Sequence, residues 1–250
     1  MTTIPVSNGT SNSGSSGRSN GTPAPAAPRA VFDWFSAVAA LGVVGIYIRA
    51  IYFTPIERLQ GAAQKIYYLH VPAALAAYIA ISITALMSIV YLWLHDERAD
   101  RLAEAGAEVG LVFLTVVLTS GPLWGHRIWG AWWAWWDMRL TLTLFLWFIV
   151  AAYLIVRGGV EEAAMRGRYS AVLAILAALL IPFIHLSVYL FQARLHPMPV
   201  VLKPGEPSLP PEMLTTFLLA FAAFALLCIA FIRARYRVGL LRDLAAELAA

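Results

Sequence analysis

Residues 71–94 read VPAALAAYIAISITALMSIVYLWL, and no charged side chain interrupts this stretch. A helix of that length measures about 36 Å, compared with about 30 Å for the hydrocarbon core of a bilayer. The stretch therefore predicts a transmembrane helix. Outward from it, similar apolar runs predict five more spans, at residues 31–53, 106–123, 140–156, 169–191 and 212–232. The fold class that follows is all-α, a polytopic membrane protein with six transmembrane helices.

The composition of the 250-residue chain agrees with this prediction. It is 60% hydrophobic and 13% charged, whereas a soluble domain is about 45–50% apolar and about 25% charged. The net charge of +4 comes from basic residues scattered over the connections between apolar runs, which favours contact with membrane lipid and argues against a nucleic-acid partner. Cys228 is the single cysteine, so a metal or haem in this protein would depend on histidine ligands.

The two ends of the chain are polar in different ways. Residues 1–30 are rich in Ser, Gly, Asn, Thr, Pro and Ala, which predicts a disordered tail. The apolar run from Val31 is longer than the core of a secretory signal, so we expect it to be retained as a helix. The predicted domains are a disordered cytoplasmic tail at 1–30, a membrane domain at 31–232 and a cytoplasmic segment at 233–250.

The distribution of basic residues predicts the orientation. Eleven of the 18 Lys and Arg residues lie in the tail, in connections 95–105 and 157–168, and in the C-terminal segment, and the other seven lie toward the opposite side. The positive-inside rule then places both termini in the cytoplasm. The outer connections would be 54–70, 124–139 and 192–211. This assignment depends on the span at 106–123, which has Glu104 and Glu108 at its start and Pro122 at its end.

Six of the nine tryptophans lie between positions 124 and 136, in an outer connection. One interpretation is an amphipathic helix at the level of the lipid headgroups, because four of them have helical spacing. The other is an aromatic platform for a flat ligand with anionic groups, such as a porphyrin, with arginines as carboxylate partners. Asp137 fits an N-cap of the fourth span as well as a ligand contact. The four tryptophans with helical spacing are Trp129, Trp132, Trp133 and Trp136, and the candidate arginines are Arg127, Arg139 and Arg194.

Two histidines are predicted at the outer mouths of spans. His70 precedes Pro72 at the start of the second span, and His196 follows the fifth span directly. Each alone reads as structural, but beside the tryptophan segment the pair fits two axial ligands of a haem iron. His185 lies eleven residues before His196, about 16 Å deeper in the membrane, and is a second candidate. His95 reads as part of a solvated connection, and the sequence assigns no role to His126.

Two motifs resemble a known family. Residues 129–141 read WGAWWAWWDMRLT and resemble the tryptophan-rich "WWD" signature of haem-handling proteins of cytochrome c biogenesis. Residues 64–74, QKIYYLHVPAA, narrow the resemblance to the haem exporter protein C (CcmC) family, whose members are similar in length to this chain. In this chain one extra residue separates Trp129 from Asp137, which leaves open which of the later tryptophans faces haem.

The resemblance implies a function, a site and a set of partners. It implies that haem b is held non-covalently at the outer face of a bacterial inner membrane and passed to the haem chaperone CcmE, without catalysis by this chain. The implied partners are CcmA, CcmB and CcmD. The implied haem-iron ligands are His70 and His196, and the implied platform is Trp129, Trp132, Trp133, Trp135, Trp136 and Asp137.

Two other functions were weighed. The permease subunit of a transporter would need polar residues along its spans, and these are sparse here. A cytochrome c haem lyase would need a large outer domain, and the predicted outer connections are short.

Overall fold

The computed structural model describes residues 33–191 and 209–249, and within these ranges the regular structure is helical. Six of the helices are long and apolar enough to cross a membrane, so the predicted fold class is confirmed. Which side holds the termini stays a prediction. The helices are α1 (Trp34–Ile48, continued by a π-helical turn at Arg49–Phe53), α2 (Tyr67–Leu94, preceded by a 3₁₀ turn at Ala62–Ile66), α3 (Glu97–Trp129), α4 (Met138–Gly159), α5 (Ala163–Leu190) and α6 (Pro211–Ala249).

Two helices are much longer than the apolar runs that predicted them. α3 begins at Glu97, where the side chain of Asp96 caps it by accepting a hydrogen bond from the Arg98 N–H, and it continues to Trp129. α6 continues without a break from the sixth apolar run to Ala249, so the described part of the predicted C-terminal segment is helical. Apolar runs mark only the lipid-facing part of a helix, because a helix beyond the hydrocarbon needs no apolar surface there.

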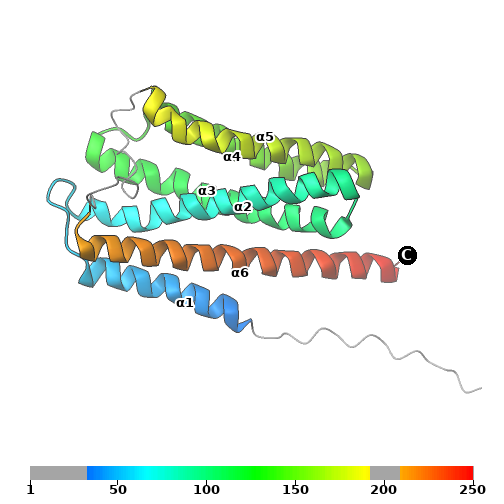
Figure 1. Cartoon of the computed structure of the whole chain (residues 1–250), viewed down its shortest axis with the longest axis horizontal. Coiled ribbons are helices and arrows are strands. Elements are labelled where there is room, and N and C mark those ends of the chain that lie inside the picture. The colour runs from blue at the N-terminus through cyan, green and yellow to red at the C-terminus, as the bar shows by residue number, and fades with distance from the viewer. Residues whose placement is uncertain (1–32, 192–208, 250) are drawn as a thin grey trace, which may run out of the picture. The chain divides into compact units, whose positions relative to one another are not determined.

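α2 is the central helix of the described bundle, packing against α3, α5 and α6. Figure 1 shows α6 and α1 on one side of the α2–α3 pair and α4 with α5 on the other. Small residues allow this close packing. A Cβ atom added at Gly106 of α3 would lie only 2.5 Å from the Thr84 Oγ1 atom of α2. The buried alanines of α2 repeat at helical spacing on this inner side, at Ala73, Ala76, Ala77 and Ala80.

The antiparallel spans gather their connections at two ends. We call the end with residues 54–66 and 124–137 the tryptophan end. The end with residues 95–96, 160–162 and the last turns of α6 is the arginine end. Near the tryptophan end, α1 is fastened to α6, because Arg49 Nε donates to Thr216 Oγ1 at 3.1 Å.

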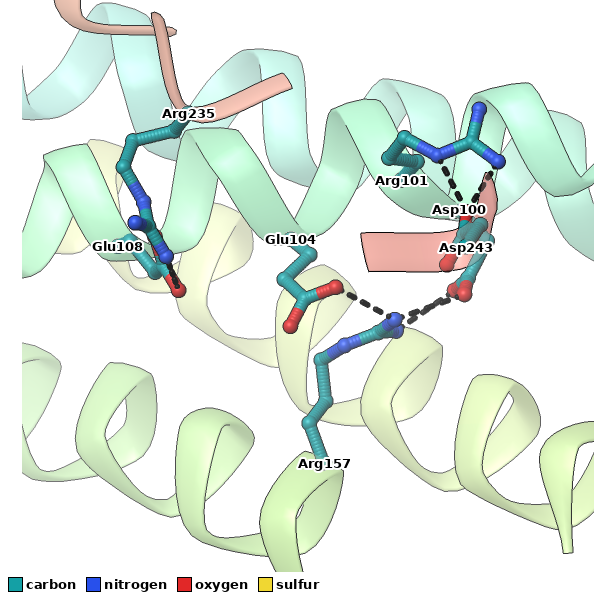
Figure 2. A network of polar contacts seen from close by, with 7 residues as sticks. All are labelled: Asp100, Arg101, Glu104, Glu108, Arg157, Arg235 and Asp243. Atoms are coloured by element: carbon teal, nitrogen blue, oxygen red, sulfur yellow. Dashed lines mark hydrogen bonds and ion pairs between the residues drawn. The ribbon is translucent and has the colours of Figure 1, made fainter. Parts of the chain in front are cut away.

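Charged side chains join three helices at the arginine end (Figure 2). Arg157 of α4 donates to both carboxylate oxygens of Asp100 at 2.7 and 2.8 Å, and to Glu104 at 3.0 Å. Arg235 of α6 pairs with Glu108 of α3, and a further pair joins Arg101 of α3 to Asp243 of α6. The glutamates that lie at the predicted start of the third span are therefore compatible with a helix, because arginines of neighbouring helices neutralise them.

Candidate functional site

The tryptophan segment has a helical first half and an irregular second half. α3 carries the chain to Trp129 and ends at Gly130, which has φ +74° and donates its N–H to the His126 carbonyl at 3.1 Å. This left-handed conformation suits glycine and ends the helix. Residues 131–137 are irregular before α4 begins at Met138. A continuous amphipathic helix through Trp129 and Trp136 is therefore wrong, because the chain leaves the helix between them.

The irregular half exposes several indole rings. Trp132, Trp135 and Trp136 are 57%, 69% and 76% exposed, while Ala134 between them is fully buried and anchors the segment. Trp133 is half-buried, with its ring centroid 5.8 Å from that of Trp135. Large exposed apolar rings at one end of a bundle form a surface on which a flat aromatic ligand can stack.

One aromatic contact ties the irregular half to the end of α3, and a second lies within α3. The rings of His126 and Trp132 stack in parallel, with centroids 4.1 Å apart and an interplanar angle of 4°. The half-buried Trp129 packs edge-to-face against Trp124 at 5.0 Å. The stack of His126 on Trp132 therefore holds Trp132 of the irregular half against the end of α3. The sequence assigned no role to His126, and its partner could not be identified from spacing.

Asp137 caps α4, as one of its two predicted roles required. Asp137 is only 3% exposed, and one carboxylate oxygen accepts hydrogen bonds from the backbone N–H groups of Arg139 at 3.0 Å and Leu140 at 3.2 Å. These bonds satisfy donors that a helix N-terminus leaves unpaired. The ligand contact that Asp137 was also given stays a prediction.

His70 lies in the first turn of α2 and is half-buried, at the tryptophan end where the sequence placed it. Its Nδ1 atom is 3.0 Å from the Ser120 Oγ atom of α3. Ser120 Oγ also lies 2.6 Å from the Val116 carbonyl, which can only accept a hydrogen bond. An Nδ1–H of His70 that donates to the serine oxygen would place the lone pair on Nε2, which is the form of imidazole that binds a metal through that atom.

Close packing fixes the ring of His70 as well. A Cβ atom added at Gly121 of α3 would lie 3.1 Å from the His70 Cε1 atom. The absence of a side chain at position 121 therefore gives the imidazole its place beside α3. Glycine inside a helix lowers helix propensity by about 1 kcal/mol relative to alanine, so a close approach gives a physical reason for it here.

A contact that the sequence analysis missed links the first connection to the tryptophans. Trp124 Nε1 donates to the side-chain oxygen of Gln60 at 3.0 Å. Gln60 lies in a turn in which the Glu57 carboxylate accepts hydrogen bonds from the backbone N–H groups of Leu59 at 2.9 Å and Gln60 at 2.6 Å. Gly61, with φ +59°, completes the turn. Glu57, with Gly61 four residues later, is compatible with a turn, but nothing in the sequence identifies Trp124 as the partner of Gln60.

α3 brings these parts of the site together. Ser120 and Trp124 are one helical turn apart, so the serine that binds His70 and the tryptophan that binds Gln60 project from the same side of the helix. His196 and Arg194 lie outside the described residues, and the pairing of His70 with His196 stays a prediction. Arg127 is exposed, and Arg139 of α4 interacts electrostatically with Tyr78, Asp137 and Tyr189.

Comparison with known proteins identifies the family. The sequence model described as "Heme exporter protein C" matches residues 20–249. This chain belongs to the heme exporter protein C family. A relative named heme exporter protein C from Bradyrhizobium diazoefficiens is 33% identical over 217 residues, covering 85% of this chain and 80% of the relative.

Other members of the heme exporter protein C family match over similar lengths. The protein of that name from Paracoccus denitrificans is 30% identical over 222 residues, covering 88% of this chain and 91% of its own length. That from Haemophilus influenzae is 30% identical over 209 residues, with coverage of 84% and 83%. The similarity therefore extends over all six helices and both motifs, and the chain is a multi-pass membrane member of a haem exporter family.

Proposed function

We propose that this chain binds haem b non-covalently at the tryptophan end and delivers it to the haem chaperone CcmE for cytochrome c maturation. The observation that carries the proposal is the hydrogen bond between His70 Nδ1 and Ser120 Oγ, which holds the imidazole at the tryptophan end in an orientation compatible with iron binding through Nε2. His196 is the second axial ligand in this proposal. Two neutral imidazoles are a common axial pair for a haem iron that transfers no oxygen.

The tryptophans supply the apolar part of the proposed site. A porphyrin that stacks on Trp132, Trp135 and Trp136 would cover rings that are now largely exposed. Trp129 and Trp133 are half-buried and complete the proposed platform, with Trp133 packed against Trp135, and Asp137 caps the start of α4. Arg127 and Arg139 are described cations close enough in sequence to the platform to pair with the haem propionates.

The location and partners follow from the same proposal. Both termini lie in the cytoplasm, and the tryptophan end faces outward from a bacterial inner membrane, where a membrane-anchored chaperone can reach it. No P-loop motif occurs in the sequence. ATP hydrolysis that releases the loaded chaperone therefore comes from the partner subunits CcmA and CcmB, with CcmD, and this chain acts as a binding protein and not as an enzyme.

Absorption spectroscopy tests the proposal. The detergent-purified protein from haem-replete cells is compared with His70→Ala, His196→Ala and Ser120→Ala. The matched control is His95→Asn at the arginine end, where asparagine tolerates the left-handed φ of +53°. We expect a Soret band in the wild type and the control, and a weaker or shifted band in both histidine variants. Ser120→Ala should keep a band of reduced intensity, because the imidazole remains but loses its orientation.

Two results would contradict the proposal. One is a colourless wild type purified together with its partner subunits, which would favour the permease function instead. The other is a spectrum that His70→Ala leaves unchanged.

A further inference from the structure

His185 of α5 is exposed on a helix that is long and apolar enough to cross a membrane. It lies five residues before Leu190, the last residue of α5, or about 8 Å inward from the tryptophan end of that helix. Phe183, Leu186 and Tyr189 are exposed around it on the same helix, as expected for a surface that faces acyl chains. An ionisable side chain in such a place is costly, so it calls for a functional explanation.

The hydrogen bond of His185 favours one tautomer. Its Nδ1 atom lies 3.2 Å from the Ile181 carbonyl, which can only accept a hydrogen bond. This contact is a hydrogen bond in the tautomer that carries the proton on Nδ1 and the lone pair on Nε2. A backbone carbonyl on the other ring nitrogen is the usual arrangement for a histidine that binds a metal through Nε2. His185 thus has, like His70, an oxygen beside Nδ1 that fits iron binding through Nε2.

The surroundings of His185 connect it to the site at His70. Its ring packs edge-on against Tyr78 of α2, with centroids 5.3 Å apart. Tyr78 is eight residues after His70 on the same helix, a distance of about 12 Å along the axis. Arg139 interacts electrostatically with Tyr78 and Tyr189, so a cation lies close to the tyrosine that His185 contacts. The side of the bundle where α2, α4 and α5 meet therefore carries a histidine, two tyrosines and an arginine.

We infer that His185 is an entry ligand, which binds the iron of a membrane-dissolved porphyrin through Nε2 before the porphyrin reaches His70. This inference rests on the proposed function, since it needs His70 as the destination. An iron porphyrin partitions into lipid through its apolar faces, and its two carboxylates would be attracted to Arg139 on the way outward. His185 would then bind the porphyrin only during loading, and the spectrum of the fully loaded protein would not depend on it.

The first arm of the test measures loading rate. Haem-free protein in lipid nanodiscs is mixed with vesicles that contain haem, and growth of the Soret band is followed over time. We expect His185→Ala to load about tenfold more slowly, since loss of even an outer-shell partner of a metal site costs about 10–100-fold. Its final spectrum should equal that of the wild type. Leu186→Ala, an exposed neighbour on α5, is the matched control and should load at the wild-type rate.

The second arm removes the destination. The double variant His70→Ala/His196→Ala should retain a weak Soret band from porphyrin held at His185, and adding His185→Ala should abolish that band. A wild-type loading rate in His185→Ala, or a residual band that persists in the triple variant, would overturn the inference. The Soret band of the single variant His70→Ala tests the proposed function and does not depend on either of these two results. Failure of the entry site is therefore distinguishable from failure of the proposed function.

Discussion

The two ends of the bundle satisfy their polar and apolar groups in opposite ways. At the arginine end, the carboxylates of Asp100, Glu104 and Glu108 are paired with arginines inside the protein (Figure 2). At the tryptophan end, three indole rings stay more than half exposed. A tryptophan buries 150–250 Å², so covering the exposed part of one ring would contribute about 2–4 kcal/mol. The carboxylates of the arginine end have their partners inside the protein, whereas the tryptophan end has apolar surface that a ligand can cover.

The comparison gives different expectations for variants at the two ends. Changes at the arginine end should lower stability and leave the ligand spectrum of the folded protein intact. Changes at the tryptophan end should alter ligand binding with little effect on stability. The predictions below test this separation, beginning with the largest effect.

The largest effect is expected from Arg157→Met. Arg157 and Asp100 expose only 7% and 12% of their side chains, so the substitution strands a buried carboxylate. Loss of one partner of such a pair destabilises a protein by about 3–5 kcal/mol. Thermal unfolding in detergent measures the loss. The variant that also carries Asp100→Asn and Glu104→Gln should recover much of it. Equal destabilisation of both variants, or a changed Soret band in the folded fraction, would contradict the expected difference between the two ends.

A smaller effect, confined to ligand binding, is expected from Gly121→Ala. The new methyl group would lie 3.1 Å from His70 Cε1 and displace the imidazole. We expect haem affinity to fall by about tenfold, measured by Soret titration, because a displaced ligand loses its orientation. Gly45→Ala is the control, since a Cβ atom there has no neighbour within 4 Å and the gain in helix propensity is the same. If the two alanine variants bind haem equally, the assigned role of Gly121 is wrong.

Gln60→Leu should loosen Trp124. The substitution removes the acceptor of the indole N–H and should cost about 1 kcal/mol locally. Hydrogen exchange of the Trp124 indole, identified with a Trp124→Phe variant, should become faster. Gln60→Glu keeps an acceptor oxygen and should exchange like the wild type. Identical exchange in the leucine and glutamate variants would show that the turn does not hold Trp124.

The smallest effect concerns pH. The backbone N–H groups of Gln60 and Leu59 donate to Glu57 and hold the pKa of its carboxyl below its ordinary value of 4.5. Because folding lowers the pKa of Glu57, its ionised carboxylate stabilises the folded turn at pH values above the unfolded pKa. This stabilisation is lost as the pH falls through the folded pKa. We expect the protection of the Gln60 amide, measured relative to its intrinsic exchange rate at each pH, to fall as the pH drops below the ordinary value of 4.5 and through the folded pKa. Glu57→Gln should remove this pH dependence, and a dependence that survives in it would assign the effect to another group.

Much of the fold followed from the sequence because lipid imposes strong local rules. A span needs about 20 apolar residues whatever its neighbours are, so six runs predicted six helices, and the second run predicted His70 at the mouth of its span. Asp137 also acted locally, as a cap. Pro72 was expected in the first turn of the helix, but α2 begins at Tyr67 and Pro72 lies inside it. The ends of α3 and α6 were not predictable from hydropathy, because helix beyond the bilayer is stabilised by ion pairs with other helices.

The sequence by itself determined the fold class, the number of spans, the cap at Asp137 and the gathering of aromatic residues in one connection, since each depends on neighbours along the chain. The tertiary structure decided which groups meet. The pairing of His70 with Ser120, of Trp124 with Gln60 and of His126 with Trp132 depends on how helices and turns pack. Spacing along a chain fixes a helix face, but the partner of that face is set by close packing between segments far apart in sequence.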